Sequence, residues 1–180
     1  MDSQTNLLNG VKYLASSHHD VRPDDIIINL LVIHSISLPP GEFSSKYIQD
    51  FFLGKLDVTQ HEYFKTIENL RVSSHALIDR SGEVIQFVPF HLRAWHAGKS
   101  SFQGRENCND YAIGIELIGD EVTPYTDEQY KALTALTRAL MQSYPGISHE
   151  RIVGHSDIAP GRKTDPGSIF DWKRFELGLN

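Results

Sequence analysis

The most apolar run of the chain lies in its first third and reads Ile26-Ile27-Ile28-Asn29-Leu30-Leu31-Val32-Ile33-His34. Apart from Asn29, residues 26–33 are all Ile, Leu or Val, which is typical of a central strand that is covered on both faces. His34 follows where this strand is predicted to end. Ligands tend to bind at strand ends in α/β sheets. The run therefore predicts the centre of a sheet and a first candidate site residue beside it.

Further strands are predicted at residues 73–78, 84–88 and 112–117, and Asp79-Arg80-Ser81-Gly82 is a hairpin turn between the first two. A hairpin pairs its strands antiparallel, so a purely parallel sheet is excluded. Helical spacing of apolar residues predicts helices at residues 44–53, 57–70, 126–144 and 170–177. The sequence thus predicts an α/β (α+β) fold with a central mixed β-sheet flanked by helices.

The composition excludes several classes of protein. The net charge of −6 and the absence of a Lys/Arg run argue against nucleic-acid binding. No stretch approaches the roughly 20 apolar residues of a membrane helix, and the N-terminus does not resemble a signal peptide. Cys108 is the single cysteine, so an intramolecular disulfide is impossible. We expect a cytoplasmic protein with one domain over residues 1–180, of which residues 1–25 form an irregular lead-in.

A second stretch carries most of the candidate chemistry and reads Gly154-His155-Ser156-Asp157-Ile158-Ala159-Pro160-Gly161-Arg162-Lys163-Thr164-Asp165-Pro166-Gly167. Catalytic zinc takes three protein ligands and keeps a fourth position for water. His34, His155 and Asp165 would form such an open site, in which zinc activates water and polarises a carbonyl. The chain has nine histidines and no HExxH pattern, so ordinary hydrogen-bonded roles for these histidines stay open.

Two charged residues are candidates for catalysis. Glu116 lies in an apolar strand, where a carboxylate is costly unless it is paired or used, and we interpret it as the general base. Lys163 would stabilise the oxyanion that forms when water adds to a carbonyl. A serine hydrolase is not favoured, because the chain has no GxSxG sequence. A nucleophilic or redox role for Cys108 is also not favoured, because a lone cysteine is more often a small, partly buried side chain without a chemical role.

Four segments together resemble a known family of enzymes. They are residues 31–43, Arg93-Ala94-Trp95-His96-Ala97-Gly98, Tyr111-Ala112-Ile113-Gly114-Ile115-Glu116-Leu117 and residues 154–167. In order and spacing they are similar to the AmpD-type zinc amidases, the cytoplasmic 1,6-anhydro-N-acetylmuramyl-L-alanine amidases of cell-wall recycling. The resemblance runs from about residue 10 to about residue 177 and implies a peptidoglycan-recognition and phage-lysozyme amidase-like fold.

The resemblance also implies roles for single residues. The family's zinc ligands correspond to His34, His155 and Asp165, and its catalytic pair corresponds to Glu116 and Lys163. Three further residues are implied to bind substrate: Arg71, which pairs with a peptide carboxylate, Trp95, whose ring faces a sugar or anchors a loop, and Ser35. Ser35 and Asn107 depart from the family's usual Asn and Arg, at positions where the resemblance implies contact with the muropeptide.

The activity implied is zinc-dependent hydrolysis of the amide between 1,6-anhydro-N-acetylmuramic acid and L-alanine of the stem peptide. The expected partner is a muropeptide, without nucleic acid or membrane, and the expected state is a monomer. Two alternatives are an amidase that acts on polymeric peptidoglycan and a non-catalytic peptidoglycan-binding or regulatory module. The missing signal peptide disfavours the first, and the complete set of ligands disfavours the second.

Overall fold

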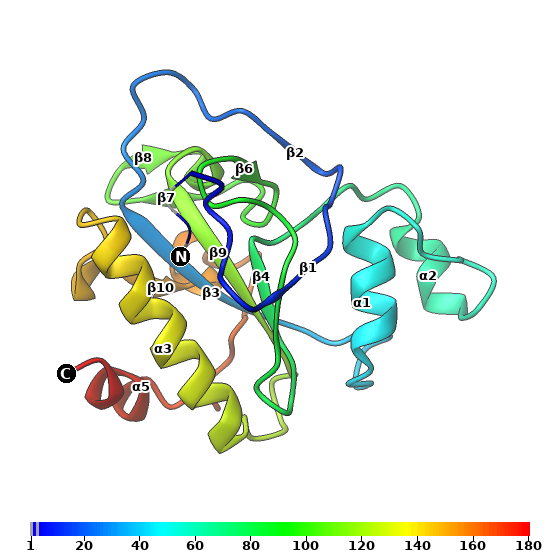
Figure 1. Ribbon diagram of the computed structural model, residues 1–180. Coiled ribbons are helices and arrows are strands. Elements are labelled where there is room, and N and C mark those ends of the chain that lie inside the picture. Colours follow the sequence, from blue (N-terminus) through cyan, green and yellow to red (C-terminus); the bar gives the residue numbers. More distant parts are fainter. Residues whose placement is uncertain (1, 3) are drawn as a thin grey trace.

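The computed structural model describes residue 2 and residues 4–180. Its centre is a six-stranded sheet in the order β1-β5-β4-β9-β3-β10, in which β5 is antiparallel to β4 and the other neighbouring pairs are parallel. Helices lie against this sheet (Figure 1). The prediction of a mixed sheet flanked by helices is therefore confirmed.

The strands are β1 (Lys12–Tyr13), β2 (His19–Asp20), β3 (Leu30–Ile36), β4 (Ala76–Ile78), β5 (Val84–Gln86), β6 (Arg93–Ala94), β7 (Ser101–Phe102), β8 (Arg105–Glu106), β9 (Ala112–Ile118) and β10 (Ile152–Gly154). The helices are α1 (Ser45–Phe52), α2 (Glu62–Ile67), α3 (Asp127–Ser143), α4 (His155–Ile158) and α5 (Trp172–Leu179). Short 3-10 turns cover Cys108–Asp110 and His149–Arg151. Among the described residues, no helix combines the length and the apolar character needed to cross a membrane.

The alternation of side chains along β3 explains how one strand serves both the core and the site. Leu31 and Ile33 pack into the cluster beneath α3, whereas Leu30 and Val32 pack into a cluster on the opposite face. Successive side chains of a strand point to opposite faces, so His34 continues the face of Leu30 and Val32. The site thus forms on the face of the sheet that α3 does not cover.

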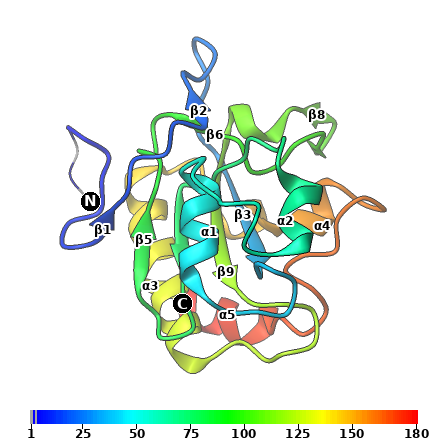
Figure 2. The same ribbon diagram turned by 90° about the vertical axis from the view of Figure 1, so that its right-hand side faces the viewer.

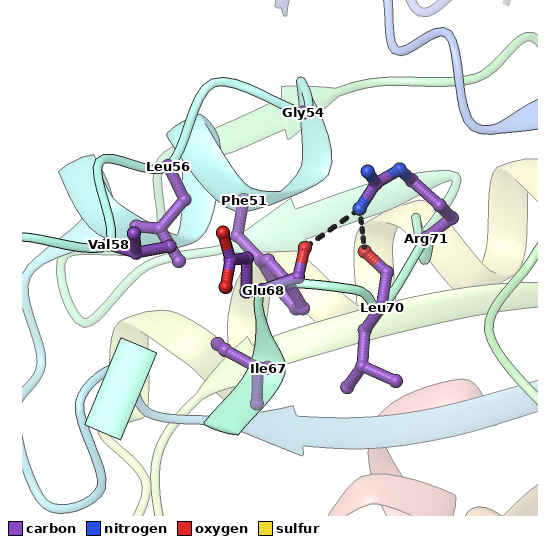
Figure 3. A pocket seen from close by; sticks show the side chains of 8 residues that line it. All are labelled: Phe51, Gly54, Leu56, Val58, Ile67, Glu68, Leu70 and Arg71. Atoms are coloured by element: carbon purple, nitrogen blue, oxygen red, sulfur yellow. Dashed lines mark hydrogen bonds between the residues drawn. The ribbon is translucent and has the colours of Figure 1, made fainter. Parts of the chain in front are cut away.

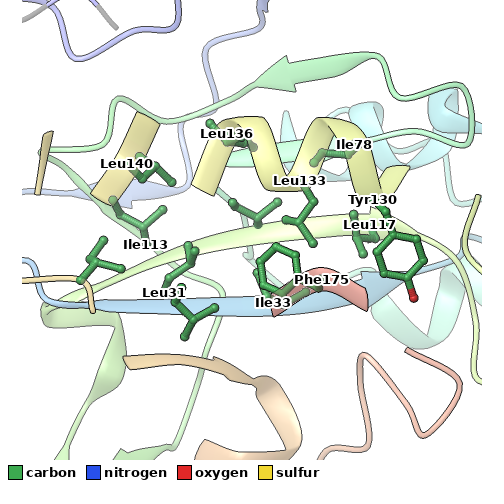
Figure 4. Packing of buried hydrophobic residues seen from close by; sticks show 14 of the residues in the cluster. Leu31, Ile33, Ile78, Ile113, Leu117, Tyr130, Leu133, Leu136, Leu140 and Phe175 are labelled. Carbon is green, nitrogen blue, oxygen red and sulfur yellow. The ribbon is translucent and has the colours of Figure 1, made fainter. Parts of the chain in front are cut away.

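Helix α3 covers one face of the sheet because its apolar residues recur at three- and four-residue steps. Leu133, Leu136 and Leu140 lie over β3 and β9, and Phe175 of α5 packs into the same cluster (Figure 4). Thr126 begins the helix with a capping box in which its hydroxyl accepts from the backbone N–H of Gln129. Burial of this apolar stripe stabilises the helix and the central strands together.

Helices α1 and α2 form a second layer at the β4–β5 side of the sheet. Their buried residues Phe51, Phe52 and Phe64 share a cluster with Leu77 of β4. The residues on either side of Leu77, Ala76 and Ile78, belong to the cluster beneath α3. Figure 2 shows α1 in front of the strands. This layer forms one wall of the cleft described below.

The structure corrects several predicted boundaries. The central strand begins at Leu30 rather than Ile26 and includes His34, because its pairing with β9 starts at Leu30 and Ala112. Residues 1–25, expected to be irregular, contain β1 and β2, of which β1 joins the main sheet. Residues 101–106, for which no strand was predicted, contain the small hairpin β7–β8. Finally, His155 begins the short helix α4, which was not among the predicted helices.

Candidate metal centre and active site

Three donor atoms from three separate segments converge at one end of the parallel strands. His34 Nδ1 lies 2.9 Å from His155 Nδ1 and 3.2 Å from Asp165 Oδ2. His155 Nδ1 lies 3.1 Å from the same carboxylate oxygen. The side chains of His34, His155 and Asp165 are 1%, 3% and 15% exposed. The three residues predicted as ligands are therefore brought together in a site largely shielded from solvent.

The fold explains this convergence. Parallel pairing of β10 with β3 sets Gly154 opposite Ile33, so the next residue in each strand direction is a histidine. The turn that carries Asp165 is held by a hydrogen bond from the backbone N–H of Ser156 to the carbonyl oxygen of Asp165. Gly154 lets this turn approach closely, since a Cβ at this position would lie 2.8 Å from Cδ of Pro166.

The protonation states suit metal binding. Burial lowers the pKa of His34 to about 4, against an opposing contribution from the nearby Asp165. Burial alone would raise the pKa of Asp165, but hydrogen bonds with His155 and His34 outweigh it and hold this pKa well below its usual range. Near neutral pH the centre therefore offers an uncharged imidazole and a carboxylate. Two imidazole nitrogens and one carboxylate oxygen within 4.8 Å of one another are a donor set that fits zinc.

Glu116 lies beside this centre as the register partner of His34 on β9. Burial and the nearby Asp165 carboxylate raise the pKa of Glu116 well above its usual value, and Lys163 partly offsets the shift. Its Oε2 atom is buried and has no hydrogen-bond partner among the described residues. A buried carboxyl group with a raised pKa and a free oxygen is a candidate for proton transfer.

A cleft of about 230 Å³ opens onto the centre. Its polar wall contains His155, Asp165, Glu116, Lys163 and Ser35. Its apolar lining comes mainly from the α1–α2 layer, and the residues that form it are Ile36, Leu38, Phe51, Phe52, Tyr63, Ile67, Leu70 and Val72. The cleft therefore joins the candidate catalytic groups to an apolar surface, as is common in pockets that bind small molecules.

The three predicted substrate-binding residues lie at different distances from the centre. Ser35 lines the cleft directly. Arg71 is exposed in an adjoining pocket of about 260 Å³, where its Nη1 atom donates to the carbonyl oxygens of Glu68 and Leu70 (Figure 3). That pocket shares Phe51, Ile67 and Leu70 with the cleft, so Arg71 stands on the far side of the apolar lining.

Trp95 has a different environment. Its indole N–H donates to Asp20 Oδ1 over 3.1 Å, and its ring stacks on His18 at a centroid distance of 6.1 Å. These contacts favour the loop-anchoring alternative for Trp95. Asn107, noted for its departure from the family pattern, is exposed and lines a separate pocket with Lys99 and Arg162.

Sequence reasoning missed two features of the site. The cleft-lining residues of α1 and α2 were predicted only as parts of two helices, because helical spacing does not distinguish a buried face from one that lines a cleft. His96 was quoted only within a segment that carries the family resemblance, without a role of its own, yet its Nδ1 lies 2.9 Å from His34 Nε2. Their separation of 62 residues leaves no local pattern that links them.

Comparison with known proteins agrees with this geometry. Residues 22–168 match the family model described as N-acetylmuramoyl-L-alanine amidase. The chain is 55% identical to the 1,6-anhydro-N-acetylmuramyl-L-alanine amidase AmpD of Haemophilus influenzae, over 97% of this chain and 95% of that protein. A crystal structure of a selenomethionine AmpD derivative is 52% identical, covers each chain fully and superposes with a TM-score of 0.96.

A more distant solved structure holds a ligand. The amidase AmiD from Escherichia coli, in complex with the substrate anhydro-N-acetylmuramic acid-L-Ala-D-γ-Glu-L-Lys, is 28% identical with a TM-score of 0.62. The alignment covers 87% of this chain and 60% of that one. The family match spans most of the chain and both sequence and fold agree with it, so the chain belongs to the N-acetylmuramoyl-L-alanine amidase family.

Proposed function

We propose that this chain is a zinc-dependent 1,6-anhydro-N-acetylmuramyl-L-alanine amidase that acts on free muropeptides in the cytoplasm. The observation that carries the proposal is the convergence of the His34, His155 and Asp165 donor atoms beside the buried Glu116. The names of relatives that are 55% identical over nearly the whole chain support the choice of substrate. The chain has a single cysteine and cannot form an intramolecular disulfide, which agrees with the proposed reducing compartment.

His34, His155 and Asp165 would hold the zinc ion. When bound there, zinc supplies Lewis-acid chemistry, in that it polarises a carbonyl oxygen and acidifies water. Glu116 takes a proton from the attacking water as its oxygen bonds to the lactyl carbonyl carbon. Glu116 then gives the proton to the nitrogen of L-alanine as the C–N bond breaks. The products are the anhydromuramic acid carboxylate and a free stem peptide.

Lys163 lines the same cleft as Glu116 and carries the positive charge that offsets the raised pKa of that carboxyl group. We assign to it the stabilisation of negative charge on the carbonyl oxygen during attack. Ser35 contacts the substrate within the cleft, and Arg71 pairs with a carboxylate of the stem peptide. The contact of Trp95 with a sugar ring stays a prediction. We also propose that the chain acts as a monomer, which agrees with a centre whose five residues all come from one chain.

The substrate assignment is tested by incubating the zinc-loaded protein with 1,6-anhydro-N-acetylmuramyl-tripeptide and with polymeric peptidoglycan. Mass spectrometry should detect anhydro-N-acetylmuramic acid and free tripeptide from the first, with much slower release of peptide from the second. Faster release from polymer would contradict the proposed substrate. Binding of the anhydromuropeptide without any cleavage would indicate a non-catalytic module.

A further inference from the structure

The two histidines of the centre turn their second ring nitrogens towards one loop. His34 Nε2 lies 2.9 Å from His96 Nδ1. His155 Nε2 lies 3.1 Å from the carbonyl oxygen of Ala97. His96 and Ala97 are consecutive residues that follow β6, so a two-residue segment contacts the outward side of both histidine ligands.

The direction of these hydrogen bonds follows from the nitrogens that face the centre. A nitrogen that binds a metal offers its lone pair, so the proton of a neutral ligand imidazole lies on the other nitrogen. His155 Nε2–H then donates to the carbonyl oxygen of Ala97, and His34 Nε2–H donates to His96 Nδ1. Both bonds fix the ring orientation and favour the tautomer in which Nδ1 is free to bind metal.

His96 occupies its position at a cost. The residue is 8% exposed, and its Nε2 atom is buried without a hydrogen-bond partner among the described residues. With Nδ1 acting as acceptor, this nitrogen carries the proton, and an unpaired buried N–H is destabilising. An apolar side chain would avoid this cost, so the histidine is explained by what its Nδ1 atom does for His34.

The surrounding structure is shaped to hold this ring. On β9, Gly114 leaves the necessary space, since a Cβ there would lie 2.5 Å from Cγ of His96. Asn109 holds the backbone of the segment, because its Oδ1 atom accepts from the N–H groups of His96 and Ala97 over 3.1 and 2.8 Å. Arg162 also donates to the carbonyl oxygen of Ala97, over 2.6 Å.

We propose that His96 and Asn109 are positioning residues of the metal centre, through which the segment His96–Ala97 sets the tautomer and orientation of both histidine ligands. His96 acts on His34 through its side chain. Asn109 acts on both ligands, because it places the His96 ring and the Ala97 carbonyl group together. The inference rests on the proposed zinc site, and it adds two residues that are not metal ligands, of which His96 also lines the cleft.

The test measures the zinc dissociation constant of purified apoprotein by competition with a chromogenic chelator. His96→Leu removes the acceptor and should weaken zinc binding about 10- to 100-fold. His96→Asn can place its Oδ1 atom where Nδ1 stood, and should restore affinity to within about threefold of the original chain. The pair Asn109→Leu and Asn109→Asp should behave in the same way, since the carboxylate keeps an acceptor for both N–H groups.

Ser100→Ala serves as the matched control. Ser100 lies in the same loop, is buried and accepts from the N–H of Cys108, but contacts neither ligand. Its loss should lower the thermal unfolding temperature of the apoprotein while leaving zinc affinity unchanged. This comparison separates positioning of the ligands from general loosening of the loop.

The outcomes distinguish the two levels of the account. If the unmodified chain binds no zinc, the proposed function fails. If that chain binds zinc but His96→Leu and Asn109→Leu bind it equally well, only the positioning role fails. Equal weakening by the leucine and the conservative variants at both positions would also overturn the role, because affinity would then follow loop packing rather than the acceptor.

Discussion

His34 and Glu116 are register partners on neighbouring parallel strands, β3 and β9. Side chains of paired residues in a sheet lie on the same face, so the pairing holds the Glu116 carboxyl group beside the metal centre. Both side chains are buried, and burial shifts both pKa values towards the uncharged form. Sheet register thus places an uncharged candidate ligand next to the candidate general base.

Glu116→Gln should abolish most of the activity without loss of zinc. The amide keeps the size of the side chain but accepts no proton from water, so we expect kcat to fall about 10²- to 10⁴-fold. Steady-state kinetics with anhydromuramyl-tripeptide, together with metal analysis of the same sample, measures both quantities. The control Glu83→Gln changes an exposed carboxylate in the β4–β5 turn and should leave kcat unchanged. A zinc-loaded Glu116→Gln protein with near-normal kcat would disprove the base assignment.

Lys163→Met should lower kcat with little effect on stability, because the side chain is exposed and supplies charge rather than packing. Loss of one group that stabilises an oxyanion typically costs about 10²- to 10³-fold in kcat. Lys131→Met, on the exposed side of α3, is the matched control. The assignment is wrong if Lys163→Met changes only KM, since the lysine would then bind substrate equally in the ground and transition states.

Arg71→Ala should weaken binding of substrate without changing the chemical step. Arg71 lies beyond the apolar lining, away from the metal ligands, so we expect KM to rise about 5- to 10-fold at constant kcat. The effect should shrink at high salt, as expected for a partly exposed ion pair. Arg138→Ala on α3 is the control. If the two variants have the same KM, the proposed contact of Arg71 with substrate is excluded.

The apoprotein should lose stability as the pH falls from about 6.5 towards 4. The pKa of His34 is lowered to about 4, chiefly by burial, and burial also lowers the pKa values of His75 and His96. The unfolded chain therefore takes up protons first, and the native state loses stability as pH drops through this window. Urea unfolding should show a loss of about 1 to 3 kcal/mol between pH 7 and pH 5.

Glu116 has the opposite effect on stability. Its pKa is raised in the native state, so the native state binds a proton there before the unfolded chain does and gains stability as the pH falls. The pH dependence should therefore be steeper in Glu116→Gln apoprotein than in the unmodified chain. Stability that does not change between pH 7 and pH 5 in either protein would contradict the assigned protonation states of the buried histidines.

The sequence predicted the central strand but not its start. Ile27 is 69% exposed, and the sheet begins only at Leu30, where β9 offers a partner. An apolar run shows that a segment suits a strand, but the extent of pairing depends on a partner that is distant in sequence. The α3 boundaries were predicted more closely, because Thr126 caps the helix through local hydrogen bonds.

The same distinction applies to the site. His34, His155 and Asp165 were identified because each stands next to a recognisable strand or turn, and because the family resemblance links them. His96 and Asn109 have no such local signal. Their roles depend on hydrogen bonds to residues brought close by the sheet, and these appear only in three dimensions.

The central claim is most directly tested by metal dependence of amide hydrolysis. Protein purified without chelator should contain about one zinc per chain by elemental analysis, and should cleave anhydromuramyl-tripeptide. Chelation should abolish cleavage and an equivalent of zinc should restore it, whereas Asp165→Ala protein should neither retain zinc at this level nor recover activity. Full cleavage by metal-free protein, or a zinc content unaffected by Asp165→Ala, would contradict the account.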